Sequence, residues 1–278
     1  MTNSVNKLMT TTISYFAKKG GVGKSTTAYN FAGYLSNSGK RVLIIDGDHQ
    51  NSVSQVILSS DVVESMPKRN TVATLFDNSA DPELTDIIHE TSDPNIYLAV
   101  ANDTLQPYAH PVPREQGELQ FVFREFVEEI RGKVDYIIFD TPPDCANLMS
   151  WNCLMASDYV VSVLGMEPMS VQSIAGTNRK IQEAIEHGNS RLKLLGYAIN
   201  MFNKKTTLHK GYEEQTRQVY GTQVFNTCIT EAVAVPEAQQ LQQHIYQYSP
   251  KSKTAKQSTA QFDELLQRIN YSVARRAA

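Results

Sequence analysis

Residues 18–27 read KKGGVGKSTT, which places three glycines beside a lysine and hydroxyl side chains. Backbone N–H groups can converge on an anion in such a loop, because glycine allows tight turns and close approach of the backbone. A lysine at position 24 would reach the β- and γ-phosphates of a nucleotide, and the Ser25 hydroxyl would ligate Mg²⁺. The sequence therefore predicts a phosphate-binding loop formed by Gly20, Gly21, Val22, Gly23, Lys24, Ser25 and Thr26.

A strand and a helix are expected on either side of this loop. Residues 11–17 are rich in β-branched and aromatic side chains, which is typical of a strand. Residues 25–35 carry apolar side chains at helical spacing, so the loop would lead into a helix N-terminus with its partial positive charge. A glycine-rich basic surface loop is the simpler interpretation, but it does not explain the strand and the helix placed where an anion site needs them.

Two other predicted strands end in acidic residues. Residues 41–45 are followed by Asp46 and Asp48, and residues 134–139 are followed by Asp140. Ligands bind at the carboxyl ends of the strands in open α/β sheets, so these carboxylates would face the phosphates. A strand that ends in aspartate is where a P-loop protein holds Mg²⁺, usually through water. The alternative, a turn with helix-capping aspartates, explains either Asp46 or Asp48 alone better than it explains both.

Strands and helices alternate along the chain, and no linker separates two domains. This order predicts one α/β domain at residues 11–278, with a single mostly parallel twisted sheet and helices on both faces, after a flexible arm at residues 1–10. Further strands are expected at 95–100, 158–164, 192–199 and 223–229. Helices are expected at 71–76, 82–90, 115–131, 146–156, 170–187, 207–220, 236–246 and 256–272, with loops at 59–70, 102–113 and 249–253.

The composition is that of a globular protein. Hydrophobic residues make up 41% of the 278 and charged residues 20%, and no apolar run approaches the ~20 residues that span a membrane. The N-terminus lacks the apolar stretch of a secretory signal. The three cysteines and six histidines show no pair at metal-ligand or redox spacing, which favours a reducing cytosol and structural roles for the histidines.

The net charge of −3 is unevenly distributed. Residues 1–178 contain 12 Lys+Arg against 21 Asp+Glu, a net of −9, whereas residues 179–278 contain 14 against 8, a net of +6. A basic C-terminal third indicates a polyanionic partner in addition to the nucleotide, although solvated helix faces would give the same count.

Four segments resemble motifs of the ParA/MinD group of deviant Walker-box ATPases. They are KGGVGKST at 19–26, DGDHQ at 46–50, IIFDTPP at 137–143 and the strand-ending Asn200. The stretch YSPKSKTA at 248–255 also looks like the C-terminal region of the ParA/Soj partition ATPases, and the likeness runs in order from about residue 11 to about residue 272. The ordinary P-loop pattern has glycine where this chain has Lys18, a departure that the family commonly tolerates.

The resemblance implies an ATPase that uses ATP and Mg²⁺ and forms a homodimer in ATP, with both nucleotides sandwiched between the subunits. It implies that Lys19 reaches the ATP of the second subunit as an arginine finger would, and that Lys19 and Lys24 both act in catalysis. It also implies that Asp48 positions the attacking water and that Asp46 and Asp140 hold the waters around Mg²⁺. Asn200 would hydrogen-bond the adenine edge.

In the partition branch of this family the ATP dimer binds DNA without sequence specificity, and a ParB-like centromere-binding or cargo-binding activator stimulates hydrolysis and release. The resemblance therefore implies a cytoplasmic, nucleoid-associated ATPase for plasmid or chromosome partition, with no stable membrane association. Lysine and arginine supply non-specific affinity by neutralising phosphates. The candidates in the basic third are Lys204, Lys205, Lys210, Arg217, Lys251, Lys253, Lys256, Arg275 and Arg276.

Three other classes of protein remain possible on the same loop. A MinD-like membrane-cycling ATPase needs a C-terminal amphipathic helix, and residues 261–276 have that spacing, as a helix docked on its own domain also would. An iron–sulfur reductase of the nitrogenase iron-protein type bridges its subunits with two cysteines from each, but no cysteine here precedes Cys145. A ligase or synthetase would need a substrate pocket that the sequence does not identify.

Overall fold

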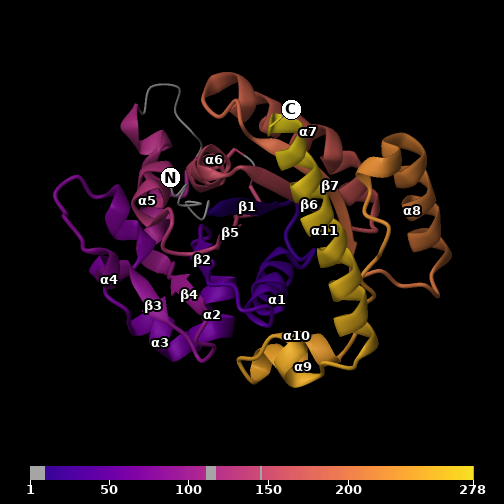
Figure 1. Ribbon diagram of the computed structural model, residues 1–278, viewed down its shortest axis with the longest axis horizontal. Coiled ribbons are helices and arrows are strands. Elements are labelled where there is room, and N and C mark those ends of the chain that lie inside the picture. The colour runs from indigo at the N-terminus through magenta and orange to yellow at the C-terminus, as the bar shows by residue number, and fades with distance from the viewer. Residues whose placement is uncertain (1–9, 111–116, 145, 278) are drawn as a thin grey trace, which may run out of the picture.

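The computed structural model describes residues 10–110, 117–144 and 146–277, and a seven-stranded sheet runs through the centre of this part of the chain (Figure 1). The order across the sheet is β3-β4-β2-β5-β1-β6-β7, and β3 alone of these strands runs antiparallel to its neighbour. The predicted fold class is confirmed. The strands are β1 Thr11–Phe16, β2 Val42–Asp46, β3 Ile88–Glu90, β4 Ile96–Ala99, β5 Tyr136–Asp140, β6 Tyr159–Gly165 and β7 Lys193–Asn200.

Helices cover both faces of the sheet. The α-helices are α1 Lys24–Ser36, α2 Ser52–Leu58, α3 Ser60–Ser65, α4 Leu84–Ile87, α5 Val122–Ile130, α6 Leu148–Ala156, α7 Pro168–His187, α8 Thr207–Tyr220, α9 Ala234–Gln240, α10 Ile245–Tyr248 and α11 Lys253–Ala277. Short 3₁₀ helices are η1 Lys68–Asn70, η2 Val72–Phe76, η3 Asp103–Tyr108, η4 Glu118–Gln120 and η5 Gly221–Gln223.

The two faces hold separate parts of the core, because successive strand residues point to opposite sides of a sheet. Ile13 and Ile44 pack with α1 and α11 on one face, while Leu43 and Phe139 pack with α5 and α6 on the other. All seven residues of β6 are buried, as expected for a parallel strand covered on both sides.

The structure corrects several element predictions in the second half of the chain. Residues 223–229 do not form a strand and pair with the sheet only at single bridges. The reason is that the Arg268 guanidinium binds the carbonyls of Thr222, Gln223 and Val224 at 2.8, 3.2 and 3.3 Å, which ties this stretch to α11. The helix predicted at 236–246 is two short helices, α9 and α10, because the chain turns at Gln242 with a left-handed φ of 57°.

Several element predictions in the first half of the chain also differ from the structure. The helix predicted at 82–90 is only α4, since residues 88–90 pair with β4 as the edge strand β3. The loop predicted at 59–70 contains α3 and η1, and the long helix predicted at 115–131 is η4 followed by α5. The flexible arm at residues 1–9 and residues 111–116 lie outside the described residues. Thr10, predicted to belong to the arm, is buried and its hydroxyl donates to the Val134 carbonyl at 2.6 Å.

Part of the final helix packs its apolar side chains into the domain. Phe262, Leu265 and Ile269 of α11 are buried in the same core cluster as α1, and Figure 1 shows α11 lying along the molecule beside α1. No helix in the described ranges combines the length and the apolar character needed to cross a bilayer.

Candidate nucleotide-binding site

The predicted site residues meet at the carboxyl ends of adjacent parallel strands. β1 leads directly into the glycine-rich loop and lies between β5 and β6. Asp46 and Asp140 are register partners in β2 and β5, and Asn200 is paired with Gly165 at the ends of β7 and β6. The sheet order, which the sequence did not specify, is therefore what brings these side chains to one edge.

The loop depends on glycines with left-handed backbone angles. Gly21 and Gly23 have φ values of 77° and 82°, and Gly23 caps the N-terminus of α1. A Cβ atom at position 23 would lie 2.4 Å from Nδ2 of Asn200, so a side chain does not fit there. Nδ2 of Asn200 also donates to the Val22 carbonyl at 3.1 Å, which fixes the loop against the end of β7.

The Asp140 carboxylate has the character expected of a magnesium-site residue. It is fully buried, and neither of its oxygens accepts a hydrogen bond of good geometry from the described residues. Burial raises the pKa of Asp140 to about 6, and the nearby Lys24 ammonium and Ser25 hydroxyl oppose this rise. A buried carboxylate beside a serine hydroxyl fits Mg²⁺ as a counter-ion. No cluster of three or more His, Cys, Asp or Glu ligands occurs among the described residues, so phosphate and water would complete the coordination.

Asp46 is more fully engaged by the protein itself. Its Oδ1 accepts from the Asp48 backbone N–H at 3.0 Å, and its Oδ2 accepts from the backbone and hydroxyl of Ser54 at 3.2 and 2.7 Å. Burial, followed by the charge of Asp140, raises the pKa of Asp46. Asp46 therefore shapes the turn that carries Asp48. Ser54 gave no sequence signal, because it lies in α2, eight residues after its partner at the end of β2.

Asp48 lies at the edge of the phosphate cleft. This cleft has a volume of about 880 Å³ and is lined by Asp48 together with Gly20, Gly21, Lys24 and Ser25. The Asp48 side chain is mostly buried, and its Oδ1 accepts from the backbone N–H of Gln50 at 3.0 Å. A carboxylate held at the rim of a phosphate site has the placement that positioning of a water would require.

Lys19 lies apart from its own cleft. Its ammonium is ion-paired with Glu167, which follows β6, and both side chains are substantially exposed. Lys19 is not among the described residues that line the phosphate cleft, whereas Lys24 is. Glu167 was not singled out from the sequence, although it follows a predicted strand and the rule applied to Asp46 and Asp140 could have found it.

A second cavity of about 560 Å³ opens next to the loop and has the size of a nucleoside site. Asn200, the residue predicted to contact adenine, lines it. The cavity and the phosphate cleft share Gly23, Thr26, Met201 and Gln239, so the two are direct neighbours. Nε2 of Gln239 donates to the Thr26 hydroxyl at 2.9 Å. Nothing in the sequence pointed to Gln239, which is more than two hundred residues away from its partner.

The basic candidates for DNA contact divide into two exposed groups. Lys204, Lys205 and Lys210 lie at the start of α8, and Lys251, Lys253 and Lys256 lie around the start of α11. Arg217 differs, because its guanidinium binds Glu213 at 3.0 Å and the carbonyls of Phe225 and Asn226 at 3.1 and 3.2 Å. The Arg217 side chain therefore stabilises the packing of α8 against residues 225–226. Arg275 is exposed and lies over the Tyr271 ring, and the Arg276 side chain lies outside the described residues.

The fold and the site together define the class of protein. A glycine-rich loop between β1 and α1, a buried lysine, a serine hydroxyl and aspartates at two adjacent strand ends are the parts of a P-loop nucleotide-binding ATPase.

Comparison with known proteins gives the family. Residues 10–194 match the family model described as an AAA domain, and the chain belongs to this family as a ParA/Soj-type member of the ParA/MinD ATPases. It is similar to the chromosome-partitioning ATPase Soj of Thermus thermophilus, with 29% identity over 258 residues, which cover 91% of this chain and 94% of that protein. The prediction of an ATPase with ATP and Mg²⁺ as cofactors is confirmed.

Two solved structures share the fold. The apo form of McdA from Cyanothece has a TM-score of 0.78 at 21% identity and covers 92% of this chain and 99% of its own. Cobyrinic acid a,c-diamide synthase from Mycobacterium smegmatis with bound ADP and magnesium also has a TM-score of 0.78, at 22% identity, with 94% and 96% coverage. At these identities the likeness concerns architecture, and the function has to be argued from the site.

Proposed function

We propose that this protein is a ParA-type ATPase for DNA partition, whose ATP-bound dimer binds DNA without sequence specificity and releases it on hydrolysis. The observation that carries the proposal is the position of Lys19, which is in the phosphate-loop motif yet is paired with Glu167 and does not line the phosphate cleft. A cation in that position serves catalysis only if it neutralises charge on the nucleotide of a second subunit. The similarity to a protein named for chromosome partition supports the same proposal.

Each site residue then has a defined task. The loop N–H groups and Lys24 hold the phosphates, while Ser25 and Asp140 would hold Mg²⁺, which neutralises phosphate charge when bound. Asp46 fixes the turn that presents Asp48, and Asp48 orients the attacking water. Asn200 lines the nucleoside cavity and would contact the adenine edge.

The described surface favours DNA over a membrane as the anionic partner. Three of the apolar side chains that a membrane helix would need, Phe262, Leu265 and Ile269 of α11, are buried in the core. The lysines at the starts of α8 and α11 are exposed. Hydrolysis would be stimulated by a separate centromere-binding or cargo-binding protein, and the ATPase would act in the cytoplasm on the nucleoid. An iron–sulfur role has no support among the described cysteines, because Cys153 is buried and Cys228 is half-buried beside Glu213 and Arg217.

Fluorescence anisotropy with a labelled DNA duplex of arbitrary sequence tests this function. We expect binding in ATP and Mg²⁺ at least about 20-fold tighter than in ADP, with an affinity that falls steeply with salt because bound phosphates release counterions. Lys24→Ala is the control and should bind DNA equally weakly in both nucleotides. Co-sedimentation with anionic vesicles in ATP, without DNA binding, would instead assign the membrane-cycling class. Rapid ATP turnover with a small-molecule acceptor and no partner protein would assign a synthetase.

A further inference from the structure

The cavity next to the phosphate loop has one wall that comes from far along the chain. We call residues 231–245 the wall segment; it contains α9 and the turn that leads into α10. Its members Ala232, Val235, Pro236 and Gln239 line the cavity. The wall segment forms no part of the sheet beyond a single neighbouring bridge at Thr230, so other contacts must hold it in place.

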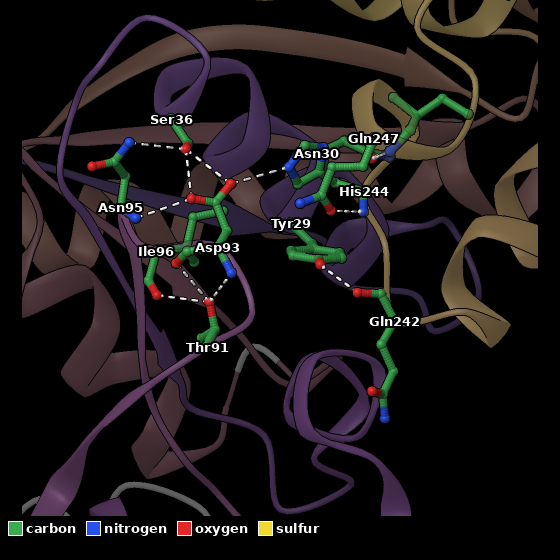
Figure 2. A network of polar contacts seen from close by, with 11 residues as sticks. Tyr29, Asn30, Ser36, Thr91, Asp93, Asn95, Ile96, Gln242, His244 and Gln247 are labelled. Atoms are coloured by element: carbon green, nitrogen blue, oxygen red, sulfur yellow. Dashed lines mark hydrogen bonds and ion pairs between the residues drawn. The ribbon is translucent and has the colours of Figure 1, made fainter.

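Those contacts are made by the helix that begins at the phosphate loop. Nε2 of Gln239 donates to the Thr26 hydroxyl at 2.9 Å, next to the phosphate cleft. One turn further along α1, the Tyr29 hydroxyl donates to the carbonyl of Gln242 at 3.1 Å (Figure 2). Gln242 has a left-handed φ of 57°, which non-glycine residues adopt rarely and only where surrounding contacts stabilise it.

The same face of α1 holds the end of the wall segment. The Asn30 side-chain oxygen accepts from the backbone N–H of Ile245 at 2.8 Å. At Gly33 the helix has no side chain, and the ring of His244 takes the space: a Cβ atom there would lie 2.3 Å from Cγ of His244. Positions 26, 29, 30 and 33 are neighbours on one helical face, so α1 forms a continuous seat for the wall segment.

His244 is the deepest part of this contact. Its side chain is fully buried, and its ring packs edge-on against Tyr29 at a centroid distance of 5.7 Å. Its Nε2 lies 3.4 Å from Oδ2 of Asp93. Asp93 is itself fixed by the Ser36 hydroxyl at 2.7 and 2.9 Å and by the Asn95 backbone N–H at 3.0 Å, as Figure 2 shows. His244 thus joins the wall segment to the far end of α1 and to the turn before β4.

We propose that His244, held by Asp93 and seated on Gly33, is a positioning residue that sets the wall of the nucleoside cavity. It acts through the wall segment and does not contact the nucleotide; its effect passes to Gln239 and Pro236. The proposal rests on the nucleotide lying in this cavity, which is part of the proposed function. It predicts that a change at His244 weakens binding of the nucleoside part of ATP but not of the phosphates. The reason is that the wall segment faces the nucleoside, whereas the loop alone holds the phosphates.

The test compares two ligands by isothermal titration calorimetry with Mg²⁺. ATP engages both parts of the site, whereas tripolyphosphate engages only the loop. For His244→Ala we expect the Kd for ATP to rise about tenfold and the Kd for tripolyphosphate to change less than about twofold. His244→Gln, whose amide can replace Nε2 toward Asp93, should keep the Kd for ATP within about threefold of wild type. His89→Ala, on the edge strand β3, where Nε2 of His89 lies 2.8 Å from the Asn70 carbonyl, is the control and should change neither value.

An ATP affinity within twofold of wild type in His244→Ala would overturn the proposal, and so would an equal loss of both ligands. If His244→Ala does not fold by circular dichroism, His244→Leu decides in its place, because it keeps much of the packed volume and removes the bond to Asp93. Lys24→Ala tests the placement of the nucleotide separately from the role of His244, and it should lose binding of both ATP and tripolyphosphate. If it binds both normally, the nucleotide placement itself is wrong and the role of His244 falls with it.

Discussion

The ammonium of Lys19 is paired with the carboxylate of Glu167. Lys19 lies five residues before Lys24, which is buried in the phosphate cleft. An exposed pair of this kind contributes only about 0–1 kcal/mol, so it can be exchanged at small cost for contact with a phosphate. Lys19 is thus held by Glu167 and does not line the cleft for its own nucleotide. Under the proposed function, Lys19 would leave Glu167 to reach the nucleotide of a second subunit.

Lys19→Ala should separate binding from hydrolysis. ATP affinity is expected to stay within about threefold of wild type, because Lys19 does not line its own cleft, while partner-stimulated hydrolysis falls by about 10³-fold or more, as for an arginine finger. Titration calorimetry and phosphate release measure the two quantities. Glu167→Gln is the control, since it frees Lys19 without removing it and should hydrolyse at least as fast as wild type. Wild-type hydrolysis by Lys19→Ala would refute the trans role.

Asp140→Asn should stabilise the protein without nucleotide while weakening the response to Mg²⁺. The pKa of Asp140 is raised to about 6 by burial, so at pH 7 the folded state carries an unfavourable buried charge that the unfolded state does not. Removing this charge should raise the free energy of unfolding by roughly 1–3 kcal/mol at pH 7, and the gain should shrink as the pH falls below 6. Urea unfolding at pH 7 and 5 measures it. A variant less stable than wild type at pH 7 would contradict the assignment.

His244 should make stability depend on pH in the opposite direction. Burial lowers the pKa of His244 below its usual value even though Asp93 opposes the shift. The unfolded chain therefore binds a proton first as the pH falls, so the stability present above pH ~6.5 is lost as the pH drops through the folded-state pKa. Between pH 7.5 and 5.5 wild type should lose more stability than His244→Gln, by up to about 1.4 kcal/mol per pH unit. Parallel curves for the two proteins would show that His244 does not titrate on unfolding.

Gly33→Ala gives opposite results in two backgrounds. With His244 present, the added methyl group overlaps the ring and should raise the Kd for ATP, as His244→Ala does. In His244→Ala the space is open, and the same substitution should stabilise the helix by about 0.5–1 kcal/mol. A double-mutant cycle on urea unfolding and ATP binding measures this coupling. Additive effects would mean that Gly33 and His244 do not share one space.

The parts of the fold that follow from local patterns were predictable. The strand, loop and helix around Lys24 and the aspartates at the ends of β2 and β5 all appear where the sequence placed them, because each depends on residues near in the chain. Strand β3 and the stretch after Gly221 were not, since pairing with β4 and capture by Arg268 decide them. The same limit applies to Gln239 and His244, because their contacts with α1 join residues more than two hundred positions apart.

The central claim is that ATP joins two copies of this chain and that hydrolysis separates them. Asp48→Ala tests it most directly, because it should bind ATP but hydrolyse it at least about 100-fold more slowly, which holds the bound state. Sedimentation velocity of Asp48→Ala with ATP and Mg²⁺ should give a particle of twice the 31.1 kDa chain mass, and with ADP a particle of that mass itself. Saturated Asp48→Ala that sediments as a monomer in ATP would contradict the account.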